Sequence, residues 1–244
     1  MPKGRIVVWI NRSGTFKLLM MAGLAVLMMF LLTNQLPSTE TWTHWTMPLS
    51  GKVVAIDAGH GGPDGGAVSK EGLVEKEVAL SIAQHVRDYL QQAGAIVVMT
   101  REDDRDLAGE DTKGYSKRKT EDLLNRVELI QAKKADLLIS IHLNSIASSR
   151  WYGAQTFYYP GNENGKKLAG FIQEEIRANL KNTDRVAKTE DQFYLLKALP
   201  IAAALVEVGF LSNPEEARML GDIQYQKKMA EAIYRGVLRY MTER

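Results

Sequence analysis

Cysteine is absent from this 244-residue sequence, and histidine occurs only four times. A chain without cysteine has no disulfide, no thiolate nucleophile and no cysteine ligand for a metal. Any metal site must therefore be built from histidine and carboxylate side chains. At 45% hydrophobic and 25% charged residues, a chain of this length can bury a full-sized core in one globular domain without disulfides.

Acidic residues are missing from the first 39 positions, whereas four basic residues lie close to the N-terminus: Lys3, Arg5, Arg12 and Lys17. Without these four, 27 basic residues stand against 29 acidic ones, so the N-terminus accounts for the formal net charge of +2. The rest of the chain has no excess of basic residues of the kind that binds nucleic acid. We therefore predict no nucleic-acid partner.

The segment 18–32 contains no charged residue and follows directly on this basic flank. Such a pair is typical of a secretory signal or a membrane anchor, and the absence of a small-x-small cleavage site after it favours an anchor. A buried core helix is the weaker alternative, because the run is apolar on every side. We assign residues 1–32 to a signal peptide or membrane anchor, with everything beyond them outside the cytoplasm.

Residues 33–50 are rich in Thr, Ser and Pro and lack periodicity, which predicts a linker. From residue 51 to residue 244, short apolar runs alternate with amphipathic segments. We predict strands at 53–56, 95–99, 137–141, 154–159 and 201–208, and helices at 74–93, 118–134, 163–180 and 222–242. Strands that are apolar on both faces and alternate with helices predict an α/β fold, a single domain with helices flanking a largely parallel central sheet.

Two of the four histidines and one carboxylate lie at the ends of predicted strands. His60 follows the first strand, His142 follows the strand at 137–141, and Glu207 lies near the end of the last strand. Ligands of open α/β sheets bind outside the carboxyl ends of the strands. A lone histidine there is usually structural, but two histidines with a carboxylate in an otherwise apolar strand indicate a functional site.

Helix geometry points to one further ligand, Glu75. At 100° per residue, Val78, Ile82 and Val86 all lie within about 60° of Glu75, so its side chain is directed into the protein. Glu77 falls on the opposite, polar side. The alternative is that Glu75 complements the helix dipole, which does not require an inward orientation.

Two imidazoles and one carboxylate are a standard catalytic zinc shell, with the fourth position left for water. We expect one Zn²⁺ per chain, held by His60, Glu75 and His142. Hydrolysis then needs a second carboxylate that takes and relays a proton, and Glu207 is the candidate. The alternative for Glu207 is a buried ion pair.

These residues lie in four blocks that resemble the zinc-dependent N-acetylmuramoyl-L-alanine amidases: Val54–Gly62, Glu75–Lys76, Ile139–Ser145 and Val206–Asn213. The resemblance implies cleavage of the amide between the lactyl group of N-acetylmuramic acid and the L-alanine of the stem peptide. It also implies zinc binding by His60, Glu75 and His142 and acid/base catalysis by Glu207. Arg101 and Asn144 match positions expected to order loops or contact substrate.

The layout, a short catalytic domain at 51–244 behind an apolar segment, resembles the germination-specific amidases of spore-forming bacteria. It implies an extracytoplasmic enzyme, anchored or secreted, that prepares cortex peptidoglycan for muramic-lactam formation. Peptidoglycan is the expected partner, with the membrane a second partner if the N-terminal segment stays uncleaved; the need for an accessory protein is left open. A zinc peptidase cutting within the stem peptide and a non-catalytic wall-binding protein are the alternatives.

Overall fold

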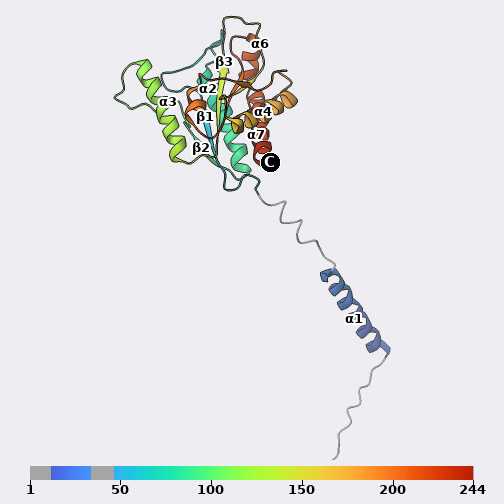
Figure 1. Cartoon of the computed structure of the whole chain (residues 1–244). Coiled ribbons are helices and arrows are strands. Elements are labelled where there is room, and N and C mark those ends of the chain that lie inside the picture. Colours follow the sequence, from blue (N-terminus) through green and yellow to red (C-terminus); the bar gives the residue numbers. More distant parts are fainter. Residues whose placement is uncertain (1–11, 34–46, 244) are drawn as a thin grey trace, which may run out of the picture. The chain divides into compact units, whose positions relative to one another are not determined.

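The computed structural model describes residues 12–33 and 47–243, which belong to two separate compact units (Figure 1). The first unit contributes one helix, α1 (Arg12–Thr33). Its window Ser13–Phe30 has a mean hydropathy of 1.7, and the helix is long and apolar enough to cross a membrane. A signal sequence would have the same properties. Residues 1–11 of the basic N-terminal flank and residues 34–46 of the expected linker lie outside the described residues.

The second unit is built on a six-stranded sheet in the order β2-β1-β3-β6-β4-β5. Strands β1, β2, β3 and β6 are mutually parallel, whereas β4 pairs antiparallel with β6. The α/β fold with a largely parallel central sheet is therefore confirmed. The strands are β1 (Val53–Ala58), β2 (Ile96–Met99), β3 (Leu137–Asn144), β4 (Gln155–Tyr158), β5 (Lys188–Thr189) and β6 (Ala202–Phe210).

Helices cover both faces of this sheet, and each face has its own apolar core. On one face, α2 (Glu75–Gln92), α4 (Glu163–Leu180) and α7 (Ile223–Thr242) enclose the larger core. On the other face, α3 (Tyr115–Ala132) and the short α5 (Tyr194–Ala198) enclose the smaller one. The short α6 (Pro214–Leu220) packs against β6 and α7.

The folded unit starts earlier than residue 51. Leu49 is fully buried, and its backbone N–H donates to the carbonyl of Ala93 at 3.0 Å. Leu49, which we expected in the linker, thus contributes to the larger core, whereas its neighbours at 47, 48 and 50 are exposed. Three short elements have no counterpart among the predicted ones, namely β5, α5 and α6.

Alternation along the parallel strands decides which side chains meet at the carboxyl edge. Residues 139 and 141 of β3 pack into the larger core, so Ser140 and His142 project toward the α3 and α5 side. On β6, Leu205 and Glu207 project to the same side, and His142 is the register partner of Glu207. The two strands therefore deliver an imidazole and a carboxylate to one point.

Candidate metal centre and active site

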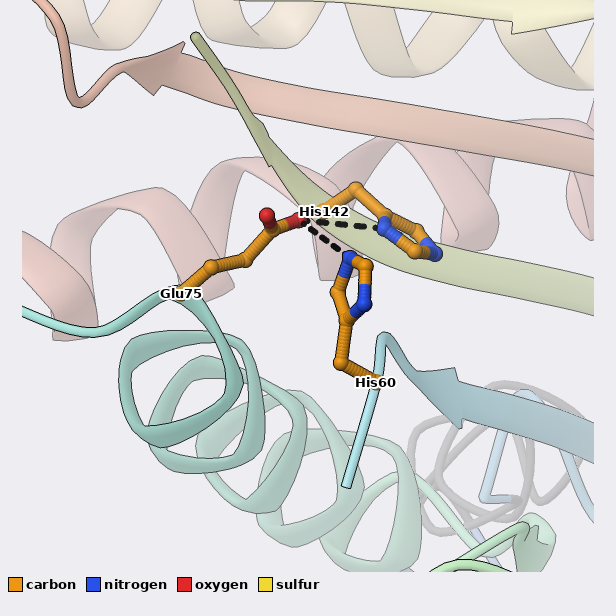
Figure 2. Close-up of side chains that lie close together, drawn as sticks. All are labelled: His60, Glu75 and His142. Carbon is orange, nitrogen blue, oxygen red and sulfur yellow. Dashed lines mark hydrogen bonds and ion pairs between the residues drawn. The ribbon is translucent and has the colours of Figure 1, made fainter. Parts of the chain in front are cut away.

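His60, Glu75 and His142 form a compact cluster at the carboxyl edge, with one ligand atom from each residue within 4.8 Å of the others. Glu75 Oε1 lies 3.2 Å from His60 Nε2 and 3.1 Å from His142 Nδ1 (Figure 2). His60 comes from the turn after β1, Glu75 from the first residue of α2, and His142 from β3. The three residues that the sequence singles out are thus brought together from three different elements.

The turn that carries His60 has an unusual backbone. His60 has a φ of +59°, in the left-handed region that non-glycine residues rarely adopt. A Cβ at Gly59 would lie 2.5 Å from the His142 ring, and a Cβ at Gly66 would lie 2.6 Å from Glu75 Oε2. Only glycine at these two positions leaves room for the imidazoles and the carboxylate.

Two fully buried arginines hold this turn by its carbonyl oxygens. Arg126 donates to the carbonyl of His60 at 2.6 Å and to that of Ala58 at 2.9 Å. Arg101 donates to the carbonyl of Gly59 at 2.8 Å and to that of Lys76 at 2.7 Å. Because Lys76 follows Glu75, the Arg101 guanidinium connects the turn that carries His60 to the start of α2, which carries Glu75.

Charge and protonation inside the cluster favour a bound cation. Burial raises the pKa of Glu75, but hydrogen bonds from His142 and His60 outweigh it and hold that pKa well below its usual range. For His60, burial lowers the pKa, yet Glu75 and Asp64 raise it above its ordinary value. The Glu75 carboxylate is ionised, and its negative charge between the two imidazole rings favours a cation at this site.

The spacing also fits zinc. Ligand atoms about 2.1 Å from a tetrahedral zinc ion are about 3.4 Å apart, close to the two distances from Glu75 Oε1. Two histidine nitrogens and one carboxylate oxygen are a recurrent donor set for catalytic zinc. The donor set and the two distances from Glu75 therefore fit a zinc ion.

Glu207 lies beside this cluster, as the register partner of His142, but in the described part of the chain its carboxylate is not paired as that of Glu75 is. Its Oε2 is buried and has no hydrogen-bond partner among the described residues. Burial, helped by the charge of Glu75 and opposed by the two histidines, raises the pKa of Glu207 to about 7. A carboxylate with that pKa can both accept and release a proton near neutral pH.

Comparison with known proteins identifies the family. The family model of the N-acetylmuramoyl-L-alanine amidases matches residues 54–239, nearly the whole folded unit. The chain belongs to this amidase family. It is therefore a hydrolase whose substrate is peptidoglycan, in a family that depends on zinc, and His60, Glu75 and His142 are its candidate metal site.

Several known amidases are similar to this chain in sequence and in structure. The germination-specific N-acetylmuramoyl-L-alanine amidase of Bacillus subtilis is 53% identical over 219 residues, covering 90% of this chain and 92% of the relative. The CwlD amidase of Clostridioides difficile, solved in complex with the GerS lipoprotein, superposes with a TM-score of 0.77 at 41% identity, covering 79% of this chain and all of that one. AmiC2 of Nostoc punctiforme gives 0.67 at 33% identity, with 80% and 99% covered.

Sequence reasoning on this amidase missed Asp64. Its carboxylate lies 3.0 Å from His60 Nδ1, accepts from the backbone of Gly66 and pairs with Lys119 at 3.0 Å. A carboxylate on the second nitrogen of a ligating histidine fixes the tautomer and orientation of the ring. The i,i+4 spacing from His60 was the available signal, but it lies in a glycine-rich turn where helical spacing carries no information.

Arg101 and Asn144 have backbone roles in this amidase. Arg101 is 1% exposed, and its guanidinium donates to the carbonyl groups of Ala58 and Gly59. The carbonyl of Asn144 accepts from Leu211 at 2.8 Å and so continues the β3–β6 pairing past a register shift. His85 is half-buried on α2, ten residues along the helix from Glu75.

Beside the cluster, a cavity of about 210 Å³ opens between α3 and the segment before α5. His60 and His142 form one wall, while Leu123, Leu195 and Leu205 provide an apolar floor. Lys119 and Gln192 add polar groups to the lining. The amidase thus has a cavity directly next to its candidate metal-binding cluster.

Proposed function

We propose that this amidase hydrolyses the amide between the lactyl group of N-acetylmuramic acid and L-alanine, with zinc held by His60, Glu75 and His142. The observation that carries the proposal is that Glu207 lies next to this cluster, with a buried Oε2 that has no hydrogen-bond partner among the described residues. A metal-binding role alone would not require Glu207. Hydrolysis does, because a proton must leave the attacking water and reach the departing amine.

When bound, zinc supplies Lewis-acid polarisation of the scissile carbonyl and lowers the pKa of a water molecule. Glu75 contributes an ionised carboxylate that is held between the two imidazoles. Asp64 keeps the His60 ring in one orientation, and Arg101 and Arg126 keep the turn beneath it in place. These residues bind and orient, whereas Glu207 moves the proton.

Glu207 acts first as a general base and then as a general acid. As a carboxylate it accepts a proton from the attacking water, and it then donates that proton to the nitrogen of L-alanine as the C–N bond breaks. A pKa of about 7 suits both steps, since neither protonation state is strongly favoured at neutral pH.

The biological setting follows from the relatives. We propose that the enzyme acts on spore cortex peptidoglycan and prepares it for muramic-lactam formation, supported by 53% identity to a germination-specific amidase. Helix α1 supports export and a place on the outer side of the membrane. A lipoprotein partner is one further candidate, because the C. difficile relative was solved in such a complex.

Substitution of Glu207 tests the mechanism. We expect Glu207→Ala to bind zinc as the wild type does but to release no stem peptides from purified peptidoglycan. Metal analysis of the purified chains and mass spectrometry of the digested muropeptides measure the two properties. Activity retained in Glu207→Ala would refute the assigned role.

The same digest separates the amidase from a zinc peptidase that cuts within the stem peptide. Only the amidase frees the lactyl carboxyl of muramic acid together with the amino group of L-alanine. We expect intact stem peptides that begin with L-alanine. Muropeptides that keep L-alanine on the lactyl group but lack later residues would instead favour the peptidase.

A further inference from the structure

A second hollow, of about 430 Å³, is lined by none of the residues His60, Glu75, His142 and Glu207. Two loops line it, through residues Arg150–Tyr152 and Lys181–Arg185. The first loop joins β3 to β4, and the second follows α4. The hollow is therefore built by loops, which tolerate specialisation without disturbing the core.

Its place in the fold links it to the active site. The loop at 150–152 leads into β4, whose first residue, Gln155, is the register partner of Glu207. The side chain of Gln155 donates to the carbonyl of Val186 at 2.5 Å, next to the second loop. The hollow thus lies at the carboxyl edge of the sheet, one strand away from the proposed catalytic carboxylate.

The hollow presents two large aromatic side chains to solvent. Trp151 is 45% exposed and Tyr152 is 63% exposed, and Val186, which follows Arg185 in the chain, is also exposed. Their backbone is held in place, since Asn213 donates to the carbonyl of Trp151 and Arg185 donates to that of Gly153. Exposed aromatic rings on an anchored loop indicate a binding surface.

The chemistry of these groups matches a carbohydrate that carries acids. The negative face of an aromatic ring attracts the weakly positive C–H face of a pyranose. Arg150, whose guanidinium lies 5.4 Å from the Trp151 ring centre, and the exposed Lys181 add cations that pair with carboxylates. Asp184 is the acid in the lining, so cations outnumber it.

We propose that this hollow binds the glycan of the peptidoglycan strand beyond the muramic acid being cut, with Trp151 and Tyr152 stacking on N-acetylated hexosamine rings. The inference rests on the proposed function: a polymer whose scissile amide lies at the metal cluster must continue along the carboxyl edge. Arg150 and Lys181 then meet carboxylates of a neighbouring stem peptide. The site is a polymer-binding subsite and takes no part in the chemical step.

Binding to whole peptidoglycan in the presence of EDTA tests the proposal, because chelation stops cleavage. We expect the full-length chain in detergent to co-sediment with purified sacculi, and Trp151→Ala/Tyr152→Ala to bind about tenfold more weakly. With zinc restored, the KM of this variant for polymeric substrate rises while kcat is unchanged. Ile96→Ala, an exposed apolar residue at the start of β2 on the opposite edge, is the matched control and should bind as the wild type.

Two further variants keep the test decisive. Trp151→Phe/Tyr152→Phe retains both rings and should bind within about twofold of the wild type, which separates stacking from a folding defect. Lys181→Ala should weaken binding to intact sacculi but not to glycan stripped of stem peptides, because only the former carries peptide carboxylates.

Wild-type binding and KM in Trp151→Ala/Tyr152→Ala would overturn the proposal and leave the surface to a protein partner. The failure of the proposed function is distinct: it would be seen as cleavage by Glu207→Ala, which the EDTA binding measurement does not involve.

Discussion

Asp57, beneath the His60–Glu75–His142 cluster, and Glu207, beside it, have pKa values that are shifted in opposite directions. Below the cluster, Asp57 accepts hydrogen bonds from Arg126, Thr100 and Ser140, and Arg126 also pairs with Asp122. Burial alone would raise the pKa of Asp57, but Arg126 and these partners lower it to about 2. Among the described residues, Glu207 Oε2 has no hydrogen-bond partner, and burial raises the pKa of this carboxyl to about 7.

The number of hydrogen-bond partners distinguishes a carboxylate that holds the backbone in place from one that can exchange a proton. A buried charge with every hydrogen bond satisfied keeps one protonation state and one position, so it can hold a turn in place. A buried carboxylate left unpaired is costly to keep charged and is ready to exchange a proton. The fully buried Asp57 and the half-buried Glu207 therefore serve different purposes because their hydrogen-bond partners differ.

Removing the carboxylate shared by both histidines should have the largest effect. We expect Glu75→Ala to lower zinc affinity by more than about a hundredfold, since loss of even an outer-shell partner costs about 10–100-fold. Peptidoglycan hydrolysis should be lost with the metal. Glu77→Ala, two residues along α2 and exposed, is the control. Competition with a chelating dye measures the affinity, and equal values for both variants would contradict the assignment.

Breaking the paired network should cost more stability than any surface change. Arg126→Ala leaves Asp57 and Asp122 buried without their cation, and we expect a loss of about 3–5 kcal/mol in the free energy of unfolding. Arg235→Ala, which removes an exposed pair with Glu231, should cost about 0.5 kcal/mol. Urea denaturation of zinc-free protein measures both, and similar losses would show that the network is not a scaffold.

Acid should weaken the same network in a defined window. The pKa of Asp57 is about 2 when folded and about 3.9 when unfolded, so its ionised form stabilises the fold above pH 4. That contribution, about 2 kcal/mol, should be lost as the pH falls from about 4 to about 2. Urea midpoints across this range, compared with those of Asp57→Asn, measure it. An identical pH dependence in the two proteins would exclude Asp57 as the cause.

The smallest effect should have the opposite sign. Glu207→Gln removes an unpaired buried charge, and we expect zinc-free protein at pH 8 to be unchanged or more stable by about 1 kcal/mol. Thermal and urea unfolding measure the change. A clear loss of stability would mean that Glu207 has a structural partner and belongs with the scaffold.

Much of this protein follows from local patterns. Apolar periodicity predicted the long helices and the parallel strands, and α4 has the predicted bounds. Helix phase selected Glu75, which is 4% exposed, over the exposed Glu77. The short elements were missed because five to seven residues hold too little periodicity, although Asn213 before Pro214 is a capping signal for α6.

By itself, the sequence determined the fold class, the family and the three cluster residues, because side-chain spacing and strand ends depend on neighbours along the chain. Only the tertiary structure decided which charges are paired. Asp57 and Arg126 are 69 positions apart, and Asp64 acquires its role through a left-handed turn. Whether a carboxylate inside the fold keeps a low pKa or acquires a raised one depends on partners brought from distant segments, and that information does not lie in any local pattern.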